Sequence, residues 1–366
     1  MQFIPLGKPD ITDKDIEAVV TVLKSGMLIQ GENILALEKS FADFHNVSHA
    51  IAVSNGTATL HLALKVLNIG VGDEVIIPAL SYIATANVVE LAGATPIFVD
   101  IDAATYNIDV SKIEEKITSS TKAIIPVHEF GLACNIEKVC AIAEKHNLFV
   151  IEDAACALGA LQNGKAAGSF GCMGSFSLHP RKSITSGEGG VLITNDEKLA
   201  IKLRQLRNHG IEMEAGKMNF IEAGFNYRLT DFQAALALSQ FERIGNILPS
   251  KQELAAIYLS EIKNSKIKLP VVPTGHNHTW QTFHVLLNEE LDQQEIISKL
   301  KEKNIGTNYG AQCIPAQTYY FNKYGYVSEK DFPNAYSAFT NGLALPLYER
   351  LTKEQVLYIA QTINQL

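Results

Sequence analysis

The sequence predicts an α/β fold, with a large domain built on a mostly parallel sheet between helices and a smaller α+β domain at the C-terminal end. Short apolar runs rich in Val and Ile alternate with amphipathic segments from about residue 50 to residue 206. Such runs are typical of parallel strands that helices cover on both faces. The alternation changes character after Pro270, which indicates a second unit. A chain of 366 residues, 47% hydrophobic, is long enough for one large core and a smaller one.

The large domain is predicted to span residues 1–245, and its N-terminal segment can pack at the active site. Apolar residues at helical spacing predict helices at 10–24, with Thr12 as N-cap, and at 34–44. The elements that follow are a strand at 50–54, a helix at 58–64, a strand at 74–78, a helix at 84–91, a strand at 95–100, a helix at 110–117, a strand at 123–127, a helix at 136–146, strands at 149–153 and 191–195, and a helix at 197–206.

The small domain is predicted to span residues 246–366. A polar loop at 208–227 leads to a long helix that opens at Thr230 and runs to residue 244, or continues beyond Pro249 as a second helix to residue 262. The remaining elements are a strand at 283–287, a helix at 293–303, an aromatic-rich loop at 309–326, a helix at 332–342, a strand at 343–346 and a helix at 353–363.

Composition excludes several classes of function. The net charge is −8 and no basic run occurs, which argues against a nucleic-acid partner. No apolar run reaches the ~18 residues of a membrane span, and the N-terminus does not resemble a signal peptide. The five cysteines include no Cys-x-x-Cys pair and no framework spacing. We therefore expect a cytoplasmic protein in a reducing compartment, with no membrane anchor and no metal site.

The stretch from Gly174 to Gly190 is the first candidate for chemistry. Lys182 lies there among Ser, Thr, Gly and Pro, directly before a glycine cluster. A lysine in such a loop is tuned by desolvation and by its neighbours to form Schiff bases. This stretch by itself does not separate that role from an ordinary surface lysine.

Polar residues also follow several predicted strands. The turn Asn55-Gly56-Thr57 joins a strand to a helix N-terminus, where backbone N–H groups favour a phosphate, although many such turns use Gly for shape alone. Asp153 ends another strand and is followed by small residues, so that a flat ring has room beside it. Its carboxylate would keep a pyridine nitrogen protonated, or else only cap the next segment. Tyr82 and His128 lie at or just past strand ends as well, and ligands collect at that edge of a parallel sheet.

These segments resemble those of the DegT family of pyridoxal-phosphate-dependent nucleotide-sugar aminotransferases, which belongs to the aspartate aminotransferase superfamily, fold type I. The resemblance implies a sheet of the seven-stranded type. The matching segments lie in the family's order along nearly the whole chain: 54–58, 78–85, 105–109, 126–128 with Gly131, 152–155, 176–190, 226–231 and 345–348.

The resemblance implies roles for individual residues. Lys182 forms the Schiff base with pyridoxal 5'-phosphate and shuttles the proton, and Asp153 pairs with the pyridine nitrogen. Gly56, Thr57 and Ser177 hold the phosphate, and Tyr82 stacks on the ring. The other assignments are Asn226, which reaches the phosphate from the neighbouring subunit of a homodimer with shared active sites, and His128 and Glu188 on the substrate side.

Cys156 departs from the family pattern. Family members carry His or Gln at this position, three residues past the aspartate, where the side chain hydrogen-bonds the ring hydroxyl of the cofactor. A thiol is a weaker donor, so this contact is lost, or supplied elsewhere, or Cys156 is an apolar packing residue.

The reaction implied is ping-pong transfer of an amino group from L-glutamate, which leaves as 2-oxoglutarate, to a keto group of a nucleotide-linked keto sugar. The Gly-Glu-Gly-Gly sequence at 187–190 resembles the branch that acts at C4, while the C3-acting branch tends to carry Asp in place of Glu188. A related deoxysugar dehydratase has His in place of the lysine, and His179 stands nearby. Counting back from 187–190 places the family's lysine at Lys182, which disfavours that alternative. A cofactor-binding regulator without turnover is the remaining alternative.

Overall fold

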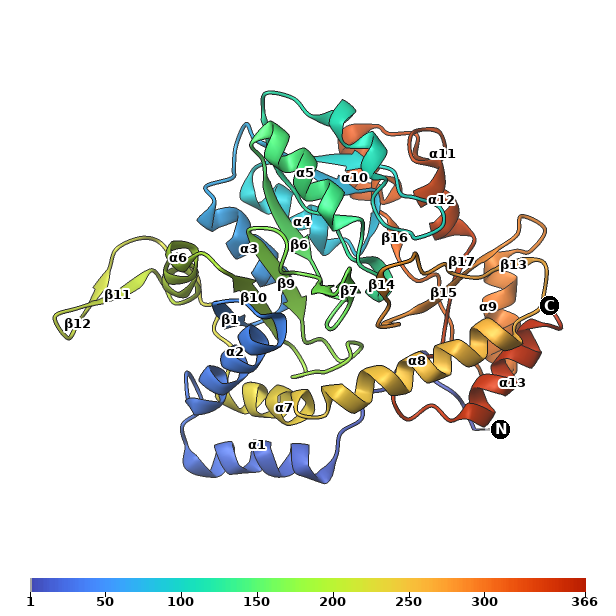
Figure 1. Cartoon of the computed structure of the whole chain (residues 1–366), viewed down its shortest axis with the longest axis horizontal. Helices are drawn as coiled ribbons and strands as arrows, with labels where there is room; N and C mark the ends of the chain where they lie inside the picture. The colour runs from blue at the N-terminus through green and yellow to red at the C-terminus, as the bar shows by residue number, and fades with distance from the viewer. Residues whose placement is uncertain (1) are drawn as a thin grey trace.

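A computed structural model describes residues 2–366 (Figure 1). Its centre is a seven-stranded sheet in the order β1-β10-β9-β6-β5-β2-β4, in which β10 alone runs antiparallel to its neighbours. The predicted mostly parallel sheet is confirmed. Its strands are β1 (His49–Val53), β2 (Glu74–Pro78), β4 (Thr95–Val99), β5 (Thr121–Ile124), β6 (Phe149–Asp153), β9 (Met173–Ser177) and β10 (Gly190–Thr194).

Helices cover both faces of this sheet, because side chains alternate between its faces along each strand. Ile51 and Val53 of β1 pack with α3, α4 and α6 on one face, whereas Ala50 and Ala52 pack with α2 and α7 on the other. Helix α5 covers the β5–β6 part of that second face. The helices of this half are α1 (Asp13–Ser25), α2 (Glu32–His45), α3 (Gly56–Val66), α4 (Ala84–Ala92), α5 (Ile136–His146), α6 (Glu197–Arg207) and α7 (Asp231–Phe241).

The C-terminal part builds a separate hydrophobic cluster around a three-stranded sheet, which is drawn above the long helix α8 in Figure 1. Ile244 and Ile247 at the start of α8 belong to the large core, whereas Leu254 and Tyr258 belong to this second cluster. The change of cluster within α8 supports a domain boundary near residue 245, which stays a prediction. The elements are β13 (Ile267–Lys268), β15 (Phe283–Leu287), β17 (Gly342–Leu345), α8 (Ile244–Glu261), α9 (Gln293–Glu302), α12 (Pro333–Thr340) and α13 (Lys353–Ile363).

Three predicted segments differ from the structure. The helix expected at 110–117 is two short 3-10 turns, η1 (Val110–Lys112) and η2 (Glu114–Lys116). The loop expected at 208–227 contains a hairpin of β11 (Ile211–Glu214) and β12 (Lys217–Phe220), which projects from the body (Figure 1). The loop expected at 309–326 contains helix α10 and smaller elements. The short elements not yet placed are β3 (Leu80–Ser81), β7 (Leu161–Gln162), β8 (Lys165–Ala166), β14 (His276–Asn277), β16 (Gln312–Cys313), η3 (Glu129–Gly131), η4 (Ile314–Ala316), α10 (Thr318–Tyr324) and α11 (Ser328–Asp331).

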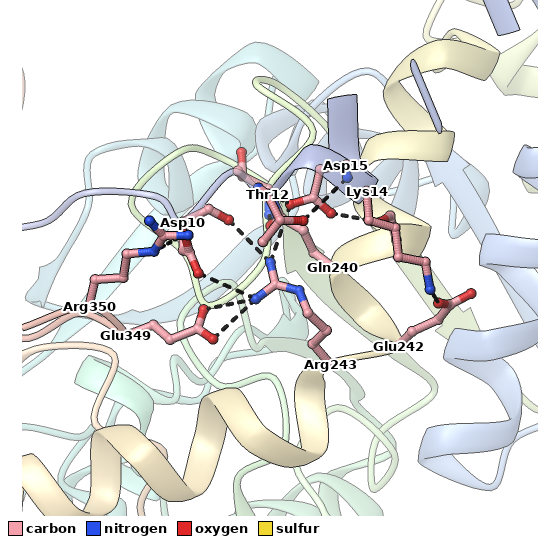
Figure 2. A network of polar contacts seen from close by, with 11 residues as sticks. Asp10, Thr12, Lys14, Asp15, Gln240, Glu242, Arg243, Glu349 and Arg350 are labelled. Atoms are coloured by element: carbon pink, nitrogen blue, oxygen red, sulfur yellow. Dashed lines mark hydrogen bonds and ion pairs between the residues drawn. The ribbon is translucent and has the colours of Figure 1, made fainter. Parts of the chain in front are cut away.

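Arg243 joins the two halves of the molecule at the start of α8 (Figure 2). Its guanidinium donates to Glu349 from the C-terminal part at 3.1 Å and to Asp15 of α1 at 3.3 Å. Asp15 is buried and also accepts from the Ser239 hydroxyl of α7 at 2.6 Å. Burial alone would raise the pKa of Asp15, but the hydrogen bonds from Ser239 and Thr12 and the Arg243 charge outweigh burial and lower it. The network therefore fixes the N-terminal segment, α7 and the C-terminal part against one another.

No helix among residues 2–366 combines the length and the apolar character that crossing a lipid bilayer would require.

Candidate active site

One cavity of about 790 Å³ lies at the carboxyl ends of the sheet strands. The residues that follow β1, β3, β5, β6 and β9 line it, and residues 308–312 and 344–347 from the C-terminal part close its other side. The predicted residues that the structure brings together here are Gly56, Thr57, Tyr82, Asp153, Cys156, Ser177, Lys182 and Glu188.

The N-terminus of α3 forms an anion cradle. Asn55 caps the helix, since its side-chain oxygen accepts from the Ala58 N–H at 2.8 Å. The first backbone N–H groups of a helix have no partner within it, and they lie at the positive end of its dipole. A Cβ on Gly56 would stand 2.9 Å from the Ser177 Cβ, so Gly56 brings the backbone close to Ser177. The cradle suits a phosphate group.

Asp153 ends β6 as a buried carboxylate without a cationic side-chain partner among residues 2–366. One oxygen accepts from the Thr85 hydroxyl at 2.9 Å and the other from the Ala155 N–H at 3.2 Å. Burial raises the pKa of Asp153, and these two hydrogen bonds and the Lys182 charge oppose that shift only in part. A cation in the cavity, such as a protonated ring nitrogen, would therefore stabilise the ionised carboxylate.

Lys182 extends into the cavity from a loop that is held at several points. The side-chain nitrogen of Lys182 lies 3.0 Å from the Cys156 sulfur. The backbone N–H of Lys182 donates to the His179 carbonyl at 2.8 Å. Further along the loop, the Thr185 N–H donates to the Gln240 side chain of α7 at 2.9 Å. The loop backbone is thereby fixed, while Lys182 itself is half-buried and free to react with a ligand in the cavity.

Tyr82 and Glu188 lie at the mouth of the cavity. Tyr82 follows β3 with 60% of its surface exposed, so one face of its ring is open to a flat ligand. Glu188 is exposed, and its carbonyl accepts from the Gln233 side chain of α7 at 2.9 Å. Both residues can contact a substrate.

His128 is not on the substrate side, which corrects the sequence-based assignment. It is fully buried and does not line the cavity. One ring nitrogen pairs with Glu152 at 2.8 Å, and the other accepts from the Cys134 N–H at 3.1 Å. Val127 and Glu129, the residues before and after His128, do line the cavity. Successive side chains of extended backbone point to opposite faces, so the side chain of His128 points away from it.

Asn226 also lies outside the cavity of its own chain. It is exposed, at the base of the segment that carries the β11–β12 hairpin, and it forms an isolated bridge with Asn208. Its predicted contact with a neighbouring subunit's cofactor is compatible with this position and stays a prediction.

Glu129 is the cavity residue that sequence reasoning missed. Only 6% of its surface is exposed, and it lies near Asp153 and Lys182. Burial raises the pKa of Glu129 to about 8, the Asp153 charge acts in the same direction, and the Lys182 charge opposes both. The sequence feature that could have identified Glu129 is its place just past a strand end, directly after His128, where a charged residue can line a ligand cavity.

Replacing Glu129 by Gln should stabilise the cofactor-free protein at alkaline pH. Between pH 4.5, the ordinary pKa, and about pH 8, the unfolded chain releases the Glu129 proton while the folded chain keeps it. The free energy of unfolding therefore falls as pH rises through this window, and Glu129→Gln abolishes that fall. We expect a gain on the order of 2–4 kcal/mol at pH 8.5 relative to pH 4.5, measured by urea unfolding.

The control for this experiment is Glu17→Gln, which changes an exposed carboxyl of α1. Its effect on the free energy of unfolding should be the same at both pH values. An equal effect of Glu129→Gln at pH 4.5 and pH 8.5 would contradict the prediction.

The residues of the cavity fit pyridoxal phosphate. Gly56 leaves room for an anion at the α3 N-terminus, where a Cβ would meet Ser177. Asp153 is a buried carboxylate that needs a cation, and Lys182 is an amine within the same cavity. Phosphate, ring nitrogen and aldehyde are three groups by which a protein can hold this cofactor, and the chain has a residue suited to each of them.

Comparison with known proteins gives relatives of the same length. A GDP-perosamine synthase of Escherichia coli O157:H7 is 38% identical over 366 residues, covering 100% of this chain and 99% of the relative. A GDP-perosamine synthase of Caulobacter vibrioides is 40% identical over 92% of this chain and 90% of its own. A spore coat polysaccharide biosynthesis protein, SpsC, of Bacillus subtilis is 36% identical over 100% of this chain and 97% of its own.

Solved structures agree with the sequence comparison. The Helicobacter pylori aminotransferase PseC, involved in the biosynthesis of pseudoaminic acid, superposes with a TM-score of 0.95 at 27% identity, over 100% of this chain and 99% of its own. The Streptococcus pneumoniae protein Spr1654, in its PLP form, has a TM-score of 0.94 at 30% identity, over 99% of this chain and 98% of its own. The profile of the DegT/DnrJ/EryC1/StrS aminotransferase family matches residues 9–364. The chain therefore belongs to the DegT/DnrJ/EryC1/StrS aminotransferase family.

Proposed function

We propose that this aminotransferase moves the amino group of L-glutamate to the C4 keto group of a nucleotide-linked keto-deoxysugar. The observation that carries the proposal is the common cavity of Lys182, Asp153 and the Gly56–Ser177 cradle, in a chain whose full-length relatives include GDP-perosamine synthases. A relative named for spore coat polysaccharide biosynthesis supports a modified sugar for a surface polysaccharide as the product's destination.

Pyridoxal phosphate is the cofactor, and when bound it supplies an electron-poor ring that stabilises negative charge on the substrate carbon. The residues of the chain hold it and move protons. The α3 N-terminus and Ser177 bind the phosphate, and Asp153 keeps the ring nitrogen protonated. Lys182 Nζ takes a proton from the donor carbon in the first half-reaction and returns one to the acceptor carbon in the second. This Nζ contacts the Cys156 sulfur at 3.0 Å, and it forms no ion pair with a carboxylate among residues 2–366.

A groove beside the cavity supports a large acceptor. It has a volume of about 640 Å³ and shares Tyr82, Tyr309 and Gln312 with the cavity, so the two are continuous. Helix α10 adds Tyr319 and Tyr320 to its wall. Aromatic faces and amide groups suit a nucleotide attached to a sugar whose keto carbon reaches Lys182.

The alternatives differ in the acceptor half-reaction. Glu188 within Gly187–Gly190 favours C4, and a C3-acting enzyme is the first alternative. A deoxysugar dehydratase would need His in place of Lys182, and His179 does line the same cavity. A regulator would bind cofactor without turnover.

A panel of keto sugar nucleotides tests the proposal. Holoenzyme is incubated with L-glutamate and with UDP-, dTDP- and GDP-linked 3-keto and 4-keto sugars, and products are read by mass spectrometry. We expect an amino sugar from a 4-keto substrate together with 2-oxoglutarate. Amination only of 3-keto substrates, loss of a hydroxyl without amination, or no turnover on any substrate would each contradict it.

The homodimer with shared active sites is part of the proposal, and the β11–β12 hairpin supports it. A two-stranded hairpin is marginal in water alone, and this one exposes Met213, Met218 and Phe220. A second copy of the chain that covered these side chains would stabilise the hairpin and bring Asn226 toward the other cavity.

Mixing Asn226→Asp with Lys182→Ala should restore activity if Asn226 acts across the interface. Asn226→Asp places a negative charge beside the phosphate and should lower the rate about tenfold or more by weakening cofactor binding. In a mixed dimer with Lys182→Ala, one site has both native residues, so about a quarter of wild-type activity should return after co-refolding. If Asn226 served its own subunit, mixed dimers would contain no intact site and activity would not return.

A further inference from the structure

Two groups on the cavity wall have no role in the chemistry described above, Glu129 and Cys156. Both lie near Lys182 and Asp153, close enough for their charges to affect one another. Cys156 contacts the Lys182 ammonium through its sulfur at 3.0 Å. Burial raises the pKa of the Cys156 thiol, with the Lys182 charge opposing, so the thiol is a weak donor.

Glu129 is held toward the cavity by its backbone. Its N–H donates to the Asn107 side chain at 2.8 Å, and its carbonyl accepts from the Leu132 N–H at 3.0 Å. The next residue, Phe130, has a φ of 56°, which is left-handed backbone that is strained for a non-glycine residue. The Phe130 ring stacks on His284 with centroids 4.4 Å apart. Backbone strain of this kind persists where surrounding contacts impose it. Here we infer that it fixes the direction in which the Glu129 side chain leaves the backbone.

The Glu129 carboxyl lacks a side-chain partner among the described residues 2–366. It forms no ion pair and no hydrogen bond with another side chain there, and the one hydrogen-bond donor that acts on its pKa is the backbone N–H of Phe130. A buried carboxyl without partners is costly. Since its pKa is about 8, the group is mostly neutral at pH 7 and carries an O–H that can donate into the cavity. A ligand atom is therefore expected to accept from it.

Pyridoxal phosphate has one polar ring group without a partner so far. The α3 N-terminus takes the phosphate and Asp153 takes the ring nitrogen, but the ring oxygen next to the reactive carbon is left. We propose that Glu129 is a positioning residue that donates a hydrogen bond from its carboxyl to this ring oxygen. This hydrogen bond takes the place of one from the Cys156 thiol, which is a weak hydrogen-bond donor. It depends on the cofactor and not on the identity of the sugar substrate.

The visible absorbance of the holoenzyme tests this directly, without donor or sugar. The visible band of pyridoxal phosphate bound through a lysine changes with protonation of the linking nitrogen, which lies beside the ring oxygen. A donor draws negative charge from the oxygen and makes that nitrogen give up its proton more readily. Glu129→Leu should therefore raise the midpoint of the absorbance titration by about one pH unit. Glu129→Gln keeps an N–H donor of nearly the same shape and should stay close to wild type.

Cofactor affinity is the second readout. Glu129→Leu should weaken pyridoxal phosphate binding by about tenfold, measured by titrating apoenzyme, and Glu129→Gln by much less. Cys156→Ala is the matched comparison on the same wall, and it should change both readouts less than Glu129→Leu does.

Three results would overturn the proposal. An unchanged midpoint in Glu129→Leu means that the carboxyl does not contact the ring oxygen. A lowered midpoint in both Glu129 variants means that the residue acts as a negative charge. A larger effect of Cys156→Ala than of Glu129→Leu assigns the contact to the thiol. If Glu129→Leu fails to fold, the near-isosteric Glu129→Gln and Cys156→Ala still decide, since a lowered midpoint in the first or a raised one in the second contradicts the proposal.

Discussion

Lys182→Ala should abolish amino transfer while leaving the fold intact. The variant loses both the amine that holds the cofactor and the group that moves the proton, so we expect the rate to fall by about 10³-fold or more. Because Lys182 is half-buried and Cys156 is its one polar side-chain contact among residues 2–366, its free energy of unfolding should change by less than about 1 kcal/mol. Stopped-flow absorbance with L-glutamate alone measures the first half-reaction.

The second half-reaction should fall in parallel, because the same Nζ serves both halves. Lys198→Ala changes an exposed lysine on α6 and provides the control, with a wild-type rate expected. A Lys182→Ala rate within tenfold of wild type, or a loss confined to one half-reaction, would mean that another group moves the proton.

Asp153→Asn should lower the rate by about 10²-fold or more at unchanged fold. The amide keeps the size of the carboxyl but carries no charge, so the ring nitrogen is no longer held protonated and the ring stabilises negative charge less well. The carboxylate is buried and burial raises its pKa, so its removal should not destabilise the cofactor-free protein. Both half-reactions should slow together in stopped-flow measurements.

Thr85→Val gives a graded comparison for this prediction. It removes the hydroxyl that donates to Asp153 at 2.9 Å but leaves the charge in place. We expect a loss of about tenfold or less, since one neutral hydrogen bond is weaker than the charge itself. A Thr85→Val variant slower than Asp153→Asn would indicate that the orientation of Asp153 matters more than its charge.

Several features of the site could be predicted because they depend on short segments. Gly56 and Thr57 are the first residues of α3, with two residues between α3 and the end of β1, and the turn that exposes their N–H groups is set by Asn55 as the cap of α3. Asp153 ends a strand, and all parallel strands present their carboxyl ends at one edge of the sheet. Strand and helix periodicity was sufficient to place these residues in one cavity.

Other features depended on contacts between distant segments. The assignment of His128 was wrong because its position at a strand end does not reveal which way its side chain points, and Glu152 in the neighbouring strand binds it on the far side. The helix expected at 110–117 became two 3-10 turns, in which Asp109 caps the first turn and Lys112 pairs with Asp100 at 3.3 Å. Helix α10 was not predicted from its aromatic segment. Its Tyr320 is buried against Phe98 of β4, and the sequence does not reveal this contact between distant segments.

The sequence by itself determined the order of strands and helices, the resemblance to an aminotransferase family, and the lysine, aspartate and glycine of the cavity, since each is encoded in a few consecutive residues. Only the tertiary structure decided that Glu129 faces the cavity without a side-chain partner among residues 2–366, and that Arg243 joins the two halves of the molecule. The physical reason is that burial, charge and hydrogen bonding at a residue come from neighbours in space. Those neighbours lie up to hundreds of positions away along the chain, as Asp15 and Arg243 do.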